Sequence, residues 1–187
     1  MNLCGTQELR TERLVLRRFR LSDAEAMYNN WASDPEVTKF LMFKPHADVE
    51  VSRRVLAQWV GSYCQGDFFQ WALTLKGCGT VIGSMGTVRV DHKLRMAHAG
   101  YCIGQRWWRQ GYTSEALAAV FSFLFETVGF NRIEACHDPR NPNSGKVMQK
   151  CGMRFEGTMR QAGTGNLGIC DLALYGLVAD DYFNNGR

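Results

Sequence analysis

One segment, YCIGQRWWRQGYTSEAL, limits the possible folds more than any other part of the chain, because it predicts a strand, a loop and a helix in succession. The strand ends at Ile103, the loop contains Gly111, and an uncapped helix begins at about Thr113 and continues over residues 114–128 with a strong apolar stripe. The amide groups of such a loop and the positive end of the helix dipole can hold a diphosphate. The alternative is a plain strand-to-helix turn that packs Trp107 and Trp108 on the core.

The rest of the periodicity predicts an α+β fold, with helices flanking a central mixed sheet. The expected strands are an opening one around Leu14 and Leu16, a run of three at residues 68–75, 81–90 and 97–103, and three more at 132–136, 153–160 and 169–177. The first expected helix starts at a capping box formed by Ser22 and Glu25, and its pattern ends at Pro35. Further helices are expected at residues 48–63 and 143–151. A length of 187 residues fits a single domain over 1–187.

Several classes of protein are excluded by what the sequence lacks. Charged residues near the start leave no apolar run for a secretory peptide, and the longest apolar run, residues 116–125, is far shorter than the roughly 20 residues that span a bilayer. We therefore expect a cytoplasmic protein with no membrane partner. The seven cysteines form no CxxC pair and the histidines form no HExxH motif, so we expect reduced thiols and no metal.

The net charge of +4 is unevenly distributed along the chain. The segment from residue 140 to residue 160 contains five basic residues and one acidic residue, Glu156, which suggests a local site for a polyanion. The basic residues are Arg140, Lys146, Lys150, Arg154 and Arg160. The earlier arginines, from Arg10 to Arg20, are interpreted as the solvated face of a strand. The charge alone leaves a nucleic-acid partner possible, but no basic-aromatic repeat or zinc-finger spacing supports one.

A GxGxxG match at Gly163, Gly165 and Gly168 is interpreted as a hairpin loop. A dinucleotide-binding fingerprint would follow a strand and open a helix, whereas this match precedes the strand ICDLALYGLV.

A second segment, HDPRNPNSGKVMQKCGMRFEG, places Asn141 and Ser144 three residues apart at a predicted helix start. With this segment and the first, the sequence resembles the GNAT acetyltransferase superfamily, and specifically its ribosomal-protein-alanine N-acetyltransferase branch. The resemblance runs from TERLVLRRF to DLALYGLVADDY, nearly the whole chain.

The resemblance implies a splayed sheet that binds acetyl-CoA as co-substrate, with the pantetheine lying like an extra strand beside Tyr101, Cys102 and Ile103. The pyrophosphate loop maps to Trp108, Arg109, Gln110, Gly111, Tyr112 and Thr113, followed by Ser114. The loop departs from the family pattern at Trp108, Arg109 and Thr113. Arg109 replaces a frequent glycine, so it must accept the glycine's backbone angle or let the loop shift. Asn141 matches the asparagine that binds pantetheine.

For catalysis, the resemblance implies direct transfer of acetyl to an amine, with Ser144 donating a proton to the leaving sulfur. His98 occupies the position where many relatives carry a glutamate, and imidazole suits proton removal near neutral pH. A buried structural role for His98 and a helix-end role for the Ser144 hydroxyl are the alternatives. The carboxylate that some relatives carry further along is Gly163 here.

The amine must be neutral to attack the acetyl group. At pH 7 about 10–15% of an α-amine is neutral, against about 0.04% of a lysine side-chain amine, so an α-amine is the more favourable acceptor. We therefore expect a protein or peptide N-terminus as acceptor. A small-molecule amine such as an antibiotic or polyamine, a non-catalytic acyl-CoA-binding regulator, and a nucleic-acid-associated protein stay open as alternatives. The sequence leaves a monomer and a homodimer equally open.

Overall fold

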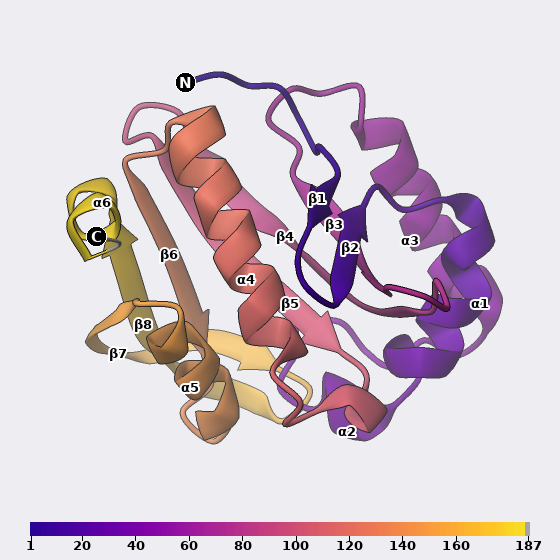
Figure 1. Ribbon diagram of the computed structural model, residues 1–187. Helices are drawn as coiled ribbons and strands as arrows, with labels where there is room; N and C mark the ends of the chain where they lie inside the picture. Colours follow the sequence, from indigo (N-terminus) through magenta and orange to yellow (C-terminus); the bar gives the residue numbers. More distant parts are fainter. Residues whose placement is uncertain (186–187) are drawn as a thin grey trace.

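The computed structural model describes residues 1–185, in which eight strands form one mixed sheet (Figure 1). Their order across the sheet is β1-β2-β3-β4-β5-β6-β8-β7, and β5 and β6 are the parallel pair. The strands are β1 (Leu9–Arg10), β2 (Leu14–Arg17), β3 (Gln70–Leu75), β4 (Val81–Asp91), β5 (Met96–Ile103), β6 (Arg132–His137), β7 (Arg154–Gly165) and β8 (Gly168–Val178). The predicted α+β class with a central mixed sheet is confirmed.

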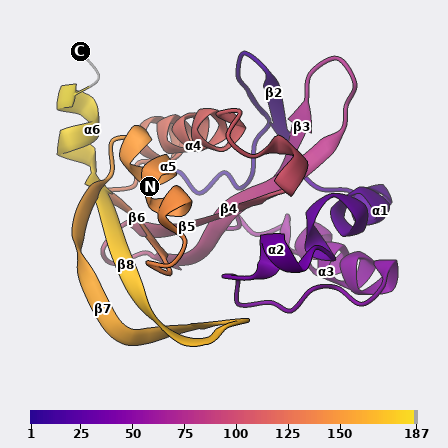
Figure 2. The ribbon, with the colours of Figure 1, turned by 90° about the horizontal axis from the view of Figure 1, so that it is seen from below.

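Helices cover both faces of the sheet. Figure 2 shows α4 and α5 on one face and α1, α2 and α3 on the other. The helices are α1 (Ala24–Met27), α2 (Pro35–Thr38), α3 (Val49–Ser62), α4 (Tyr112–Ser122), α5 (Pro142–Lys150) and α6 (Ala179–Asn185), with 3₁₀ turns at Leu21–Asp23 and Gln105–Trp107 and π-helical stretches at Tyr28–Ala32 and Phe123–Val128. Within the described residues, none of these helices combines the length and the apolar character needed to cross a membrane.

The apolar stripe of α4 forms the centre of the main core. Leu117, Val120 and Leu124 are fully buried and Phe121 nearly so, against the inward side chains of the sheet. Burying side chains of this size contributes about 1.5–3 kcal/mol each, so this stripe fixes α4 on the sheet. A second, smaller cluster, which includes Trp31 and Leu56, holds α1 and α3 on the opposite face.

The parallel strands β5 and β6 pair over three residues and then diverge. The last pair is His98 with Glu134; beyond it β5 follows β4 as far as Ile103, while β6 follows β8 as far as His137. Each strand thus stays with its outer neighbour, and a gap opens between β5 and β6. The splayed sheet that the resemblance implied is present.

The long β7–β8 hairpin curves beneath the sheet toward α2 (Figure 2). Its tip is the glycine-rich stretch, in which Gly165 pairs with Gly168, so the predicted hairpin loop is confirmed. At the tip, the Asn166 side-chain amide donates to the carbonyls of Thr38 at 2.9 Å and Phe43 at 2.8 Å. These bonds tie the hairpin tip to the end of α2 and to the loop that follows it.

The N-terminal third differs from the sequence prediction. Asp23, and not a capping box of Ser22 with Glu25, starts the first helical turn: its carboxylate accepts from the Arg20 amide at 2.8 Å and binds both terminal nitrogens of Arg17. Arg17 is therefore half-buried in an ion pair, whereas Arg10, Arg18 and Arg20 are exposed as predicted. The first helical region ends at Ala32, before Pro35 as predicted, and Pro35 itself opens α2 at its first turn, where a missing amide hydrogen costs nothing.

Candidate functional site

Two backbone groups of β5 face the gap between β5 and β6. The backbone amide of Gly104, directly after β5, donates to the Ile82 carbonyl of β4 at 2.9 Å. Because the direction of the backbone hydrogen bonds alternates along a strand, the backbone amide and carbonyl of Cys102 also point toward β4. The backbone groups of Tyr101 and Ile103 then point into the gap, and the Ile103 carbonyl accepts from the Trp108 indole at 2.8 Å. Cys102 lies differently from the other two, because its side chain enters the second core cluster, where burial raises its pKa to about 12.

At the end of β5 the chain presents the uncapped amino end of α4. The first intrahelical bond runs from the Glu115 amide to the Gly111 carbonyl at 3.0 Å, so the amides of Tyr112, Thr113 and Ser114 precede the hydrogen-bonded ladder. The Ser114 hydroxyl is occupied, because it donates to the Gly111 carbonyl. Gly111 adopts a φ of 83°, which turns the loop into the helix.

Arg109 resolves the question raised by its replacement of a glycine. It adopts a φ of 59°, in the left-handed region that disfavours side chains, and so keeps the backbone path that a glycine would take. Its side chain is exposed, as is that of Gln110. The departure from the family pattern is therefore absorbed as local strain.

Arg13, at the turn into β2, organises this loop from the other side. It donates to the Gln110 carbonyl at 2.9 Å, pairs with the Glu115 carboxylate, and lies over the Tyr112 ring. The pairing neutralises an acidic side chain in the first turn of α4, where its charge would otherwise repel an anion. The sequence analysis missed this role, for which the only signal was the opening TERLVLRRF motif.

Across the gap, the start of α5 carries Asn141 and Ser144. Asn141 stands at the cap position but its side chain makes no capping bond, so its amide is not committed to the helix. Ser144 meets the hydroxyl of Tyr101, which donates to the Ser144 carbonyl at 2.9 Å and lies 3.0 Å from Ser144 Oγ. Burial raises the pKa of Tyr101, so its hydroxyl stays protonated and joins β5 to α5.

The basic surplus of residues 140–160 does not form one site, contrary to the sequence prediction. Arg140 pairs with Asp138, and Arg154 pairs with Asp181 on α6. Lys146 and Lys150 lie exposed on α5, and Arg160 lies on the distant hairpin. The positions are close in sequence but dispersed over the loop before α5, α5 itself and β7.

His98 lies at the point where β5 and β6 separate. Its Nδ1 is 3.2 Å from Glu134 Oε1, and its Nε2 is 3.5 Å from Cys136 Sγ. Glu134 is in turn held by Arg89 at 3.0 Å and Arg132 at 3.6 Å. Neither Glu134 nor Cys136 was identified from the sequence, because only strand register brings them to His98.

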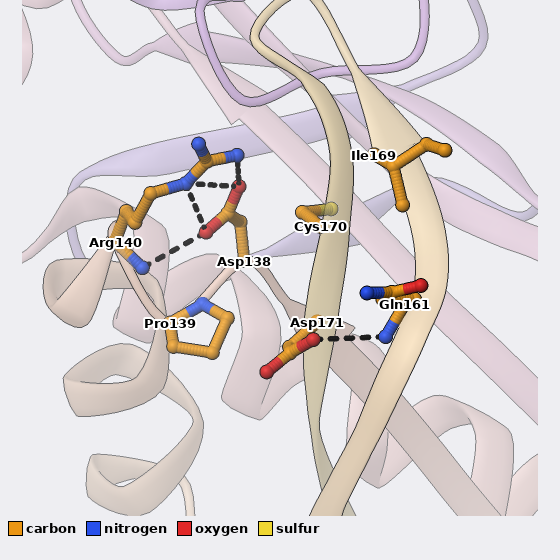
Figure 3. A pocket seen from close by; sticks show the side chains of 7 residues that line it. All are labelled: Asp138, Pro139, Arg140, Gln161, Ile169, Cys170 and Asp171. Atoms are coloured by element: carbon orange, nitrogen blue, oxygen red, sulfur yellow. Dashed lines mark hydrogen bonds and ion pairs between the residues drawn. The ribbon is translucent and has the colours of Figure 1, made fainter.

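Just after the end of β6, beside the β7–β8 hairpin, lies an open hollow of about 400 Å³ (Figure 3). Its lining consists of Asp138, Pro139, Arg140, Gln161, Ile169, Cys170 and Asp171. Hydrogen bonds from the Arg140 side chain lower the pKa of Asp138. The Asp171 carboxylate accepts a hydrogen bond from the backbone amide of Gln161 at 2.8 Å. The hollow thus lies between the β7–β8 hairpin and the end of β6, and the carboxylates of Asp138 and Asp171 are part of its lining.

The spacing of four aromatic residues in the sequence is consistent with either the lining of an acceptor cleft or the core; they are Trp31, Phe40, Phe43 and Trp71. In the structure Phe40 is half-buried. Trp31 and Trp71 are fully buried in the core, whereas Phe43 is exposed beside the hairpin tip. In the part of the chain that the structure describes, no group of three or more His, Cys, Asp or Glu residues is placed to hold a metal ion.

Comparison with known proteins gives a consistent result. A family model described as "Acetyltransferase (GNAT) domain" matches residues 13–154. The chain is 31% identical to the "Uncharacterized N-acetyltransferase p20" of Bacillus licheniformis, over 94% of this chain and 98% of that protein. The crystal structure of ribosomal-protein-S5-alanine acetyltransferase from Vibrio fischeri superposes with a TM-score of 0.83 at 22% identity, covering 94% of this chain and 98% of that one. Microcin C7 self immunity acetyltransferase MccE, solved in complex with acetyl-CoA and AMP, gives a TM-score of 0.79 at 18% identity, covering 89% and 93%.

Proposed function

Because this chain belongs to the GNAT acetyltransferase family and is an N-acetyltransferase, we propose that it moves the acetyl group of acetyl-CoA to the α-amine of a protein or peptide N-terminus. The observation that carries the proposal is the gap that opens after the His98–Glu134 pair and leads along β5 to the uncapped start of α4. Strand β5 thus leads from a gap that can hold the extended pantetheine to a helix start that can hold the diphosphate.

In this proposal the two amide groups of pantetheine bind the backbone of Tyr101 and Ile103 in the manner of an added strand. The diphosphate binds the amides of residues 111–114 and the positive end of the α4 dipole. Asn141 binds pantetheine from the opposite side of the gap. Gln110, Arg109 and Thr113 shape the loop around the diphosphate, and Cys102 contributes by packing alone, since its backbone and side chain face away.

His98 is proposed to take the proton released during transfer, and Ser144 to donate one to the departing sulfur. Glu134 supports the first role because it holds one ring nitrogen of His98 and leaves the other as acceptor. The Tyr101 hydroxyl supports the second role because it keeps the Ser144 hydroxyl at the gap. A single base of this kind suits an α-amine, which needs little deprotonation near neutral pH.

The hollow beside the β7–β8 hairpin is the proposed binding site of the acceptor. Its volume accommodates one or two residues of a peptide. Arg140 neutralises Asp138, so the carboxylate of Asp171 is the group that attracts a positively charged amine. One of the similar structures is named as a ribosomal-protein-S5-alanine acetyltransferase, which is consistent with a protein acceptor. A small-molecule amine is the second candidate, because the tethered hairpin tip encloses the cleft.

We also propose that the protein works in the cytoplasm. All seven cysteines are free in the structure, and Cys64 and Cys78 are exposed, which suits a reducing compartment.

The proposal is tested with three amines at equal concentration. They are a lysine-free peptide with a free alanine N-terminus, a peptide with an acetylated N-terminus and one internal lysine, and spermidine. Release of the CoA thiol and the mass of each amine are followed with time. Acetylation of the first peptide, with at least tenfold slower reaction of the others, is expected; faster reaction of spermidine would favour the small-molecule candidate.

Two controls separate binding from chemistry. Thermal unfolding with acetyl-CoA, CoA and NADH should show a shift with the first two alone, of about 2.7 kcal/mol at 100 times the dissociation constant. His98→Ala and Ser144→Ala should keep that shift and lose thiol release. Full activity of both variants would contradict the assigned roles. A shift with CoA but no turnover of any amine would favour the regulator, and an absent shift with CoA would favour the nucleic-acid alternative.

A further inference from the structure

Two leucines of β8, Leu172 and Leu174, lie on the face of the sheet that turns away from the main core. The residues that alternate with them, Ala173, Tyr175 and Leu177, pack in the main core. Because neighbouring side chains of a strand point to opposite faces, Leu172 and Leu174 point to the other side. Both are half-buried, and neither belongs to the core clusters of the described residues. Core packing therefore does not account for these two leucines.

Strand register places Leu174 beside the proposed base. Leu174 pairs directly with Cys136 of β6, so the two side chains share one face of the sheet. Cys136 Sγ in turn lies 3.5 Å from Nε2 of His98. Leu172 follows two residues away along β8, at a distance of about 7 Å for the rise of a strand. The two leucines thus lead from His98 toward the hollow, whose lining includes Cys170 on the same face.

The neighbours of this leucine strip, Leu174 and Leu172, on β7 leave it open and apolar. Gly157 pairs with Leu174, and a Cβ added to Gly157 would meet no atom beyond its chain neighbours within 4 Å. Met159 pairs with Leu172 and is 42% exposed. A Cβ added to Gly163 would lie 2.6 Å from Leu172 Cδ2, so Leu172 fills the space that a side chain at position 163 would need. The strip is therefore bordered on β7 by two glycines and an apolar side chain.

We propose that Leu174 and Leu172 bind the first and third side chains of the acceptor peptide and select acceptors that are apolar at these positions. This rests on the proposed transfer of acetyl to a peptide α-amine. When the amine lies at His98, an extended peptide that runs along β8 presents every second side chain to the strip. These side chains are about 7 Å apart, which is the spacing of the two leucines.

The leucine strip and the hollow divide the peptide between them. The first three residues lie along the strip, and the next one or two lie in the hollow, which has the volume for them. Asp171 attracts the charged amine as it arrives, and the strip then leads the amine to His98. A peptide leucine gains free energy by leaving water at the strip, whereas a carboxylate would lose hydration there without a partner.

The test on the wild-type protein uses lysine-free peptides that begin with alanine and differ only at the third residue, which is leucine, serine or aspartate. The N-terminal residue is the same in all three, so the difference between them reports on the strip. We expect kcat/KM to be about tenfold higher for leucine than for serine, and lower again for aspartate. Leucine at the second residue should give no such preference, because that side chain points away from the strip.

Variants assign the preference to Leu172. Leu172→Ala should raise KM for the leucine peptide at least fivefold, while KM for the serine peptide and for acetyl-CoA stays constant. Leu172→Lys should reverse the order and favour the aspartate peptide. Leu94→Ala removes another leucine, 57% exposed in the turn between β4 and β5, and should keep the wild-type preference. The thermal shift with acetyl-CoA shows that each variant is folded, and Leu172→Met, which conserves volume, should keep the preference for leucine.

The outcomes separate the leucine strip from the proposed function. Equal kcat/KM for the leucine, serine and aspartate peptides would overturn the strip and leave transfer to an α-amine in place. A preference that persists unchanged in folded Leu172→Ala would do the same. If the wild type acetylates spermidine and none of the peptides, the proposed peptide acceptor fails, and the strip fails with it.

Discussion

Arg13 donates a hydrogen bond from Nη1 to the carbonyl of Gln110 at 2.9 Å, across 97 positions of sequence. The same guanidinium pairs with Glu115, so one side chain from the first strands fixes both the loop and the first turn of α4. Charge-assisted bonds of this kind contribute about 1.5–3 kcal/mol each. The loop between β5 and α4 is thus held in shape by a residue outside it.

Replacing Arg13 should weaken cofactor binding more than chemistry. We expect Arg13→Ala to raise KM for acetyl-CoA about tenfold, which corresponds to about 1.4 kcal/mol, and to change kcat less. Steady-state kinetics with varied acetyl-CoA measure both constants. Arg10→Ala is the control, because Arg10 pairs with Glu8 on the exposed surface and should leave KM unchanged. A drop in kcat with constant KM would contradict a role in shaping the loop.

Arg109→Gly tests the strain at a φ of 59°. Glycine adopts this angle freely, so the relief of about 1 kcal/mol offsets its greater loss of backbone entropy, and the melting temperature should stay equal or rise. Arg109→Val should lower it, since a β-branched side chain fits this region worst. If the backbone amides carry the binding, Arg109→Gly changes KM for acetyl-CoA by about fivefold or less. A larger rise in KM would assign the binding to the guanidinium instead.

The stability of the fold should depend on pH through Glu115. Burial raises the pKa of this carboxyl, but hydrogen bonds from Thr11 and Arg13 outweigh it and leave the pKa below its ordinary value. The contribution of Glu115 to the free energy of unfolding is therefore present above about pH 4.3 and is lost as the pH falls through the folded-state pKa.

The measurement compares melting temperatures of the wild type and Glu115→Gln over a range of pH. The difference should be largest near neutral pH and should shrink on acidification. Glu50→Gln provides a matched control, because Glu50 also lies in the first turn of a helix but is exposed and pairs with Arg53 alone. Its difference should be small at every pH. A Glu115 difference that grows on acidification would contradict the assigned direction.

Glu134→Gln should impair catalysis without impairing binding of acetyl-CoA. A glutamine amide can donate to Nδ1 of His98 and so move the ring proton to Nε2, where it blocks the base. We expect kcat to fall about 100-fold with KM for acetyl-CoA unchanged, and the pH–rate profile to change shape. Glu156→Gln serves as control, since Glu156 shares Arg132 with Glu134 but makes no hydrogen bond to His98. Equal losses in both variants would indicate general destabilisation.

Asn166 offers a test of the hairpin as a wall of the acceptor site. Asn166→Ala removes two hydrogen bonds that hold the tip to residues 38 and 43, worth about 0.5–1.5 kcal/mol each. KM for the peptide should rise severalfold while KM for acetyl-CoA stays constant. Thr164→Ala, an exposed position of the same hairpin, should behave like the wild type. An unchanged peptide KM would place the acceptor elsewhere.

The elements that the sequence predicted correctly are those whose signal is local. The α4 stripe, the order of three strands before it and the uncapped helix start after Gly111 follow from the spacing of apolar residues and from one glycine. Those patterns indicate which face of an element is buried. The candidate phosphate loop, residues 108–114, lies within a single continuous segment of the chain. The fold class and the α4 end of the site were therefore accessible from the sequence.

The other parts were decided by tertiary structure. Cys136 and Glu134 meet His98 because β6 pairs with β5 in one register, which periodicity does not specify. The basic residues 140–160 separate because the chain passes from α5 into a long hairpin, so neighbours in sequence part in space. Contacts across dozens of residues depend on which strands are adjacent, and that is set by the joint packing of the whole sheet, not by any one segment.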